Sequence, residues 1–133
     1  LSSLEAVQDA LGIGFYSFDI ENNTALWTKA MYEILDFDAK RHTPSVEALL
    51  ACVAEDERAA LSDDFQAVLE RGVPFHRTVR LAGAAGVQIT CTCLGRARTE
   101  DDGRIPHVYG SLRVVSGNEV DPALNLAQSE TGS

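Results

Sequence analysis

Three strand-like segments joined by short glycine-containing links restrict the fold more than any other feature of this sequence. The segments 75–81, 87–97 and 105–115 are rich in β-branched, aromatic and other apolar residues. One link is bounded by Gly83 and Gly86, and the other ends in Asp102-Gly103. Such short links are typical of hairpins, which join antiparallel neighbours. The sequence therefore predicts a three-stranded antiparallel meander.

Two more strands are predicted near the start of the chain. The segment 13–20 alternates with period two, and we expect Tyr16, Phe18 and Ile20 to face inward and Phe15 outward. After a polar turn at 21–23, the segment 24–28 resumes strand character around Leu26 and Trp27. The two segments are predicted to form a hairpin.

Helical periodicity fills the middle of the chain. Thr28 is a candidate N-cap for a helix with Met31, Ile34 and Leu35 on one face, and Ser45 for a short second helix. The longest pattern begins near Glu55 and ends at Arg71-Gly72, with acid at its start and base and glycine at its end. The apolar face of this helix comprises Leu61, Phe65, Val68 and Leu69.

This order of elements predicts an α+β domain over 13–116, with a five-stranded antiparallel sheet and its helices packed on one face. Residues 1–12 are predicted to form an amphipathic helix, whose apolar positions are Leu4, Val7 and Leu11. Residues 117–133 are mostly polar and are interpreted as a tail or linker.

Composition narrows the class of protein. The chain has 133 residues, 20 acidic and 11 basic side chains and a formal net charge of −9, which argues against a nucleic-acid binder. No apolar run approaches the ~20 residues of a membrane span, and the first residues lack the pattern of a secretion signal. An odd, sparse set of cysteines favours a reducing cytoplasm over a disulfide framework. These cysteines are Cys52, Cys91 and Cys93.

The arrangement and several motifs resemble the PAS domain family over about residues 4–116. The matching positions are Gly12-Ile13-Gly14, Tyr16, Phe18-Asp19, Leu26-Trp27, Met31-Tyr32, Ile34-Leu35, Glu55-Asp56 with Arg58, Gly86, Asp102-Gly103 and Gly110. Three sites depart from the family pattern. Val53-Ala54 replace a usual His-Pro, Thr90-Cys91 stand where a tryptophan is common, and Val114-Val115-Ser116 replace the closing Asp-Ile-Thr.

The resemblance implies a sensory or regulatory module of a signal-transduction protein, such as a two-component histidine kinase. The domain itself is not expected to be an enzyme, although an output domain such as a kinase or cyclase can be attached. The module is expected to bind a small ligand or to mediate protein dimerisation. A ligand-free interaction adaptor is the alternative, and a small enzyme using Asp19 or Asp56 as a carboxylate base is a weaker one.

A small apolar cavity is predicted between the sheet and the helices. Its predicted lining is Tyr16, Phe18, Met31, Leu35, Phe65, Leu69, Cys91 and Cys93. The identity of any ligand or cofactor is open, and a tightly filled core is the alternative to a binding site.

The sequence offers candidate residues for binding a flavin, a haem or a metal ion, but in each case we favour a purely structural role for those residues. Flavin-binding relatives use a cysteine near the position of Cys52, which here has apolar neighbours. Haem would need an axial histidine, and none lies on the longest helix. The histidines are His42, His76 and His107. Cys91 and Cys93 share a strand face but lack further ligands at metal-binding spacing.

The sequence also predicts a homodimer. A helix with only Leu4, Val7 and Leu11 as its apolar face is too short to be stable alone in water. It must pack on something, and Phe15 on the outer sheet face offers an aromatic surface. The resemblance implies that this surface meets a second copy. The competing interpretation is that the helix covers its own sheet within a monomer, and contacts with other signalling proteins are also expected.

Overall fold

The computed structural model describes residues 12–82 and 88–116, which form one β-sheet with helices packed against it. The strands are β1 (Ile13–Asp19), β2 (Thr24–Trp27), β3 (Phe75–Ala82), β4 (Gln88–Arg98) and β5 (His107–Ser116). The helices are α2 (Lys29–Leu35), α3 (Val46–Cys52) and α4 (Glu55–Arg71).

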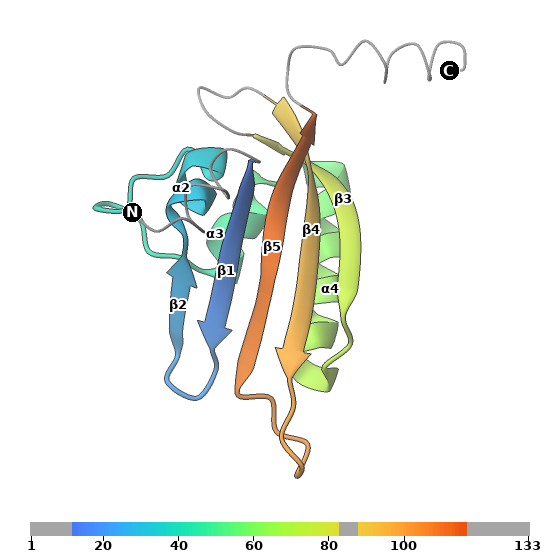
Figure 1. Cartoon of the computed structure of the whole chain (residues 1–133). Coiled ribbons are helices and arrows are strands. Elements are labelled where there is room, and N and C mark those ends of the chain that lie inside the picture. Colours follow the sequence, from blue (N-terminus) through green and yellow to red (C-terminus); the bar gives the residue numbers. More distant parts are fainter. Residues whose placement is uncertain (1–11, 83–87, 117–133) are drawn as a thin grey trace.

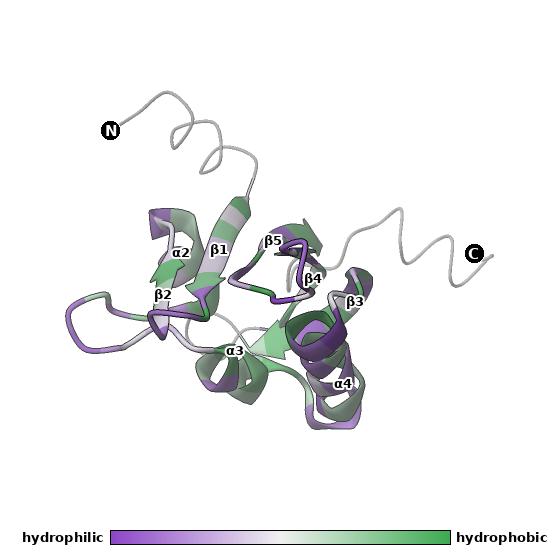
Figure 2. Cartoon of the chain, turned by 90° about the horizontal axis from the view of Figure 1, so that it is seen from below, coloured by the Kyte–Doolittle hydropathy of each residue, from purple (hydrophilic) through white to green (hydrophobic). Residues whose placement is uncertain are grey.

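All five strands form one antiparallel sheet in the order β2-β1-β5-β4-β3 (Figure 1). The first strand therefore lies beside the last, and β5 occupies the centre. Helices α3 and α4 lie on one side of the sheet when it is viewed along its strands (Figure 2). The predicted fold class, a five-stranded antiparallel sheet with helices on one face, is confirmed.

The meander of β3, β4 and β5 has the predicted order. Its second hairpin closes through Glu100, whose backbone N–H donates to Arg104 O at 2.8 Å and whose carbonyl accepts from Gly103 N at 2.9 Å. The first link, at Gly83 to Gly86, lies outside the described residues, as do the polar segment 117–133 and residues 1–11 of the helix predicted over 1–12.

The two later helices begin and end as their sequences predict. The Ser45 side chain accepts a hydrogen bond from Ala48 N at 2.9 Å, so it caps α3. Helix α4 starts with acidic residues and ends at Gly72, which has a left-handed φ of 70°. Glycine adopts this conformation at little cost, which explains why the helix stops there.

Two local predictions need correction. Thr28 is the N-cap residue of α2, as predicted, but its hydroxyl makes no capping bond. It accepts the backbone N–H of Phe15 at 3.0 Å instead, which ties the end of β2 to β1. Ile20 is not an inward strand position, because β1 ends at Asp19 and Ile20 is 42% exposed in the following turn. Its backbone N–H donates to Pro106 O at 2.8 Å, one residue beyond the last paired position of β1 and β5, Asp19 and His107.

The core lies between the inner sheet face and the three described helices. Residues from every described strand and helix meet in a single buried cluster. Its members are Tyr16, Phe18, Trp27, Met31, Leu35, Leu49, Val53, Leu61, Phe65, Val68, Val79, Leu81, Cys91, Cys93, Val108 and Leu112. The alternate strand positions point away from the helices and form the outer face of the sheet.

Candidate functional site

The residues predicted to line a cavity do come together in the interior. Seven of them belong to the buried cluster, and Leu69 of α4 is partly buried against it. Met31, Cys91 and Cys93 are fully enclosed, with 0% of their surface exposed. Whether this group of side chains binds a ligand stays a prediction.

Close contacts fill the space along the inner sheet face. A Cβ on Gly14 would lie 2.6 Å from Cγ of Met31, so helix α2 packs directly on β1. A Cβ on Gly95 would overlap the Phe75 ring, which itself packs edge-on against the ring of Phe65 at 5.0 Å. The glycines remove side chains from the sheet, and the chain's own large side chains occupy the resulting space.

Tyr16 crosses the sheet above a third glycine. Its hydroxyl donates to Leu94 O at 2.5 Å and lies 4.0 Å from Sγ of Cys93. Burial raises the pKa of Tyr16 far above its usual value, so the hydroxyl stays protonated. A Cβ on Gly110 would lie 2.5 Å from this hydroxyl oxygen. Tyrosine and glycine at these two positions therefore form a matched pair.

The cysteines of the interior are chemically quiet. Burial raises the pKa of both Cys91 and Cys93 to about 12. A thiol with such a pKa is almost entirely protonated at neutral pH, and the thiolate is the reactive form. These two side chains behave as small apolar groups of the core.

An open pocket of about 280 Å³ lies elsewhere, between the end of α3, the start of α4 and the ends of β3 and β4. Its lining is Ala51, Cys52, Val53, Ala54, Glu55, Arg58, Arg80, Leu81, Ala82 and Gln88. It shares no residue with the predicted cavity. Burial raises the pKa of Cys52, and its Sγ donates to Ala48 O at 3.5 Å. Because this thiol lies at the outer pocket and Met31 and Phe75 fill the interior, the residues present do not fit a flavin held between sheet and helices.

Arg80 fastens the start of α4 to the edge strand β3. The Glu57 carboxylate accepts the backbone N–H of Arg80 at 2.7 Å and its Nε at 3.3 Å. Asp56, also on α4, pairs with the same guanidinium at 2.6 Å. The Ala54 N–H donates to Arg80 O at 2.9 Å. This end of the edge strand is thereby paired and closed to strand addition.

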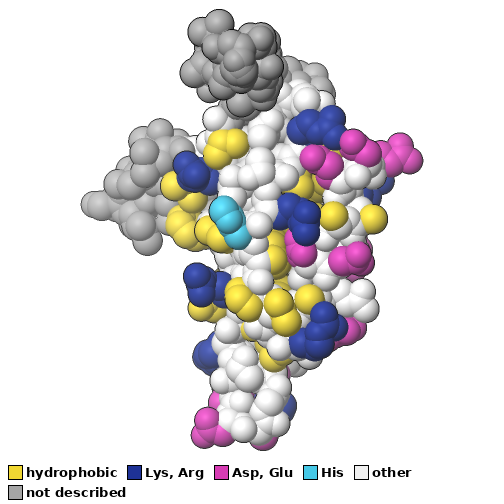
Figure 3. Space-filling model, turned by 90° about the vertical axis from the view of Figure 1, so that its right-hand side faces the viewer, with side chains coloured by type: hydrophobic (Ala, Val, Ile, Leu, Met, Phe, Trp, Pro, Cys, Tyr) yellow, Lys and Arg dark blue, Asp and Glu magenta, His cyan; other side chains and the backbone are white. Residues whose placement is uncertain are grey.

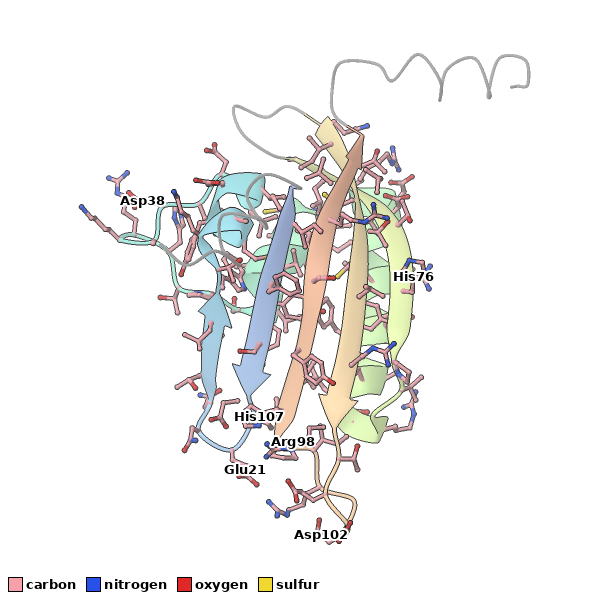
Figure 4. All side chains as sticks on the ribbon, in the orientation of Figure 1. Glu21, Asp38, His76, Arg98, Asp102 and His107 are labelled. Atoms are coloured by element: carbon pink, nitrogen blue, oxygen red, sulfur yellow. The ribbon has the colours of Figure 1, made fainter. Side chains whose placement is uncertain are left out.

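The histidines and the remaining carboxylate candidate lie apart from one another. His42 stacks on Phe37 with a centroid separation of 4.5 Å, and His76 lies exposed on β3. His107 Nε2 is 3.6 Å from Asp19 at the end of the sheet where Glu21, Arg98 and Asp102 also gather (Figure 4). Hydrogen bonds from Asn22 lower the pKa of Asp19. Within ranges 12–82 and 88–116, no three His, Cys, Asp or Glu side chains could together hold a metal ion.

The outer face of the sheet exposes large apolar side chains. The exposed side chains on this face are Phe15 (40%), Leu26 (72%), Leu94 (37%), Tyr109 (45%) and Val115 (39%). Strand register places three of them around the middle of the sheet: Phe15 and Leu94 pair with Ser111 from its two sides, and Tyr109 lies two residues before Ser111 on β5. Leu26 lies opposite Ser17 on the edge strand β2, and Val115 lies four residues beyond Ser111 along β5. We call these five residues the outer apolar patch.

Arginines flank this patch. Arg113 pairs with Thr92 in the row on one side of Leu94, and Arg96 pairs with Tyr109 in the row on the other. Neither arginine forms an ion pair with the residues that the structure describes. Figure 3, seen from the side of β3, shows basic and apolar side chains intermixed, with most acidic side chains toward one margin. By strand register, the outer sheet face of this acidic chain carries arginines beside apolar side chains.

Comparison with known families decides the classification. A family model described as the PAS fold matches residues 24–112, which is more than half of the chain. The chain belongs to the PAS family. Among curated proteins, none matches this chain.

Solved structures agree on the fold. An RNA-binding light-oxygen-voltage receptor superposes with a TM-score of 0.72 at 20% identity, over 90% of this chain and 33% of that protein, so the PAS chain spans about one third of its length. A sensory box histidine kinase/response regulator from Burkholderia thailandensis gives 0.66 at 13% identity, covering 86% of each chain. The N-terminal domain of a diguanylate cyclase with a PAS/PAC sensor from Marinobacter aquaeolei gives 0.68 at 12% identity, covering 78% of this chain and 95% of that one.

The sequence identified the interior of this PAS domain better than its surface. Phe15 was the only member of the outer apolar patch predicted to face outward. The sequence holds a signal that places Leu94 and Tyr109 outside, because each directly follows an apolar residue, Cys93 or Val108, and successive strand residues face opposite sides of the sheet. Cys93 and Val108 are both buried. Among the described residues, no helix is long and apolar enough to cross a membrane.

Proposed function

We propose that this PAS domain is a regulatory module of a signal-transduction protein, and that it acts as a homodimer through the outer face of its sheet. The observation that carries the proposal is the contrast between the two faces of the sheet. The inner face is packed against Met31, Phe65 and Phe75, whereas the outer face leaves five large apolar side chains exposed. Grouped apolar surface of this kind marks protein contacts.

The similarity to sensor domains of a histidine kinase and a diguanylate cyclase supports a role in signalling. In such a role, the domain would pass on a change in its protein contacts to an attached output domain. A cytoplasmic location agrees with the three free cysteines. The ligand-free mode is favoured over a ligand-binding one because three glycine positions of the inner face are already occupied by Met31, Phe75 and Tyr16.

The proposal is tested by one substitution within the outer apolar patch and one outside it. Leu94→Asp places a charge in the middle of the patch, and we expect the dimer to dissociate to a monomer by light scattering at about 50 µM, because a buried unpaired carboxylate is strongly unfavourable at an interface. Val73→Asp is the control, since Val73 is also an exposed apolar side chain, at 45% against 37% for Leu94, but follows α4, away from this face.

A monomeric wild-type chain, or a dimer that Leu94→Asp leaves intact, would contradict the proposal. The absorbance spectrum of the same preparation tests the ligand-free mode. A band beyond the aromatic region would show a bound chromophore and would overturn that part of the proposal.

A further inference from the structure

The hairpin between β4 and β5 carries at its tip a sequence whose backbone can react with its own side chain. Asp102-Gly103 is the only position in the chain where an aspartate or asparagine precedes a glycine. Glycine has no Cβ to hinder the approach of its backbone nitrogen to the carboxyl carbon of the preceding residue. When this N–C bond forms, the N–H proton and the carboxyl hydroxyl leave as water, and a five-membered succinimide ring closes.

Hydrolysis of the succinimide gives two products. Water that adds at the former side-chain carbonyl restores aspartate. Water that adds at the former backbone carbonyl leaves isoaspartate, in which the backbone runs through the side-chain carbonyl and is one methylene longer. Water is the only co-reactant, and nothing is oxidised or reduced.

The folded hairpin engages both reacting groups elsewhere. The backbone N–H of Gly103 donates to Glu100 O at 2.9 Å. The two carboxylate oxygens of Asp102 accept from the backbone N–H of Arg104 at 3.0 Å and from its Nε at 2.9 Å. These bonds lower the pKa of Asp102, so the carboxyl group is ionised and has no hydroxyl to lose. Attack therefore requires the turn to open and the two groups to be reoriented.

A second turn holds Arg104 in this position. The Arg104 guanidinium also pairs with Glu21, which lies in the turn between β1 and β2. Figure 4 shows Glu21 and Asp102 at the same end of the sheet. The side chains of Glu21, Asp102 and Arg104 are between 52% and 60% exposed. Contacts at such an exposed site can open locally while the core stays folded.

We propose that Asp102-Gly103 is an isoaspartate-forming site of this domain, and that Arg104, held by Glu21, keeps the reaction slow in the folded chain. The extra methylene would lie within the turn that the backbone bonds of Glu100 to Gly103 and Arg104 close. Isoaspartate would therefore loosen the hairpin tip and release Arg104 from Glu21. The proposal is independent of the proposed homodimer.

Incorporation of heavy oxygen measures the reaction. The full chain, folded or in urea, is incubated in mildly acidic water enriched in heavy oxygen, and each ring opening leaves one heavy atom in the residue. Chromatography and fragmentation mass spectrometry of the peptide then locate the label and separate aspartate from isoaspartate. We expect the folded wild type to react at least about tenfold more slowly at Asp102 than the chain in urea. Arg104→Ala should raise the folded rate by about threefold or more, because it removes an exposed charge pair that opposes opening.

Two further variants separate the role of Arg104 from charge and from misfolding. Arg98→Ala is the control, because Arg98 lies on the same hairpin but pairs with Glu100 at 3.3 Å, and it should react at the wild-type rate. Glu21→Ala leaves Asp102 and Arg104 in place, so it should raise the rate by less than Arg104→Ala does. Urea denaturation of each variant, followed by Trp27 fluorescence, shows that it is folded, and Glu21→Ala keeps the test decisive where Arg104→Ala is not.

The order of rates supports or overturns each part of the proposal. A chain in urea that gains no more label at Asp102 than at its other aspartates would overturn the assignment of the site. A folded wild type that reacts as fast as the chain in urea would overturn the protection. Folded Arg104→Ala and Glu21→Ala variants that react at the wild-type rate would overturn the role of Arg104, as would an equal rise in Arg98→Ala.

Discussion

Gly110→Ala is the substitution that tests the packing of the sheet most severely. A Cβ at this position would overlap the carbonyl oxygen of Leu94 and would lie 2.5 Å from the Tyr16 hydroxyl oxygen. The first obstacle is backbone within the central sheet, which cannot rotate away as a flexible side chain can. The methyl group must therefore separate β4 from β5, and it must also displace Tyr16 from its hydrogen bond.

The cost follows from these two contributions. Overpacking a close-packed core costs about 1–3 kcal/mol. Losing the bond from Tyr16 to Leu94 O strands buried polar groups and costs about 1–3 kcal/mol more. Together we expect about 2–6 kcal/mol of lost unfolding free energy, a large share of the ~5–15 kcal/mol that a domain usually has.

Urea denaturation followed by the fluorescence of Trp27 measures this loss, because Trp27 is the only tryptophan and is 7% exposed. Ser111→Ala, on the next residue of β5, is the control and should change stability by no more than about 0.5 kcal/mol. Tyr16→Phe alone should cost about 1–2 kcal/mol through the lost hydrogen bond. In the Tyr16→Phe background, Gly110→Ala should cost less than in the wild type. A Gly110→Ala variant within about 0.5 kcal/mol of the wild type, or equal costs in both backgrounds, would refute the reasoning.

Three further predictions concern the charges and thiols. Glu57→Ala should cost about 1–2 kcal/mol of unfolding free energy because it leaves the backbone N–H of Arg80 without its acceptor. Asp56→Ala should cost less than about 0.5 kcal/mol, because the Asp56 side chain is 73% exposed. Equal losses for the two variants in urea denaturation would contradict this. Alkylation at about pH 8 followed by mass spectrometry should label Cys52 before the two β4 cysteines, whose pKa is about 12, and simultaneous labelling in the native state would be inconsistent. Folding lowers the pKa of Asp19, so the ionised carboxylate stabilises the folded state above its ordinary pKa, and this contribution is lost as the pH falls through the folded value. The difference in unfolding free energy between the wild type and Asp19→Ala should therefore shrink between about pH 6 and pH 3. A difference that stays constant would show that hydrogen bonding to the ionised carboxylate is not the cause.

The sequence predicted most of the fold because local signals and global packing agree in this chain. Helix α4 is the clearest case, since its acidic start, its apolar face and Gly72 all indicate the same bounds. The Thr28 hydroxyl was expected to accept a hydrogen bond from the first turn of α2. It accepts one from Phe15 N instead, a donor that is remote in sequence and close in space. Such cross-strand contacts are not encoded in local periodicity.

The candidate site was predicted only in part, for a similar reason. The inward residues could be chosen from alternation, and they do meet in one cluster. The closeness of their packing could not be predicted, because it depends on which glycine faces which large side chain across the sheet. Gly14 against Met31 and Gly95 against Phe75 become visible only when strand register and helix position are both known.

The molar mass of the wild-type chain in solution tests the central claim most directly. Sedimentation equilibrium over about 1–100 µM should give twice the mass of one chain at the upper end and a fall toward one chain on dilution, as expected for an interface of ordinary size and moderate affinity. A mass of a single chain throughout this range would contradict the proposal that the outer face of the sheet joins two copies.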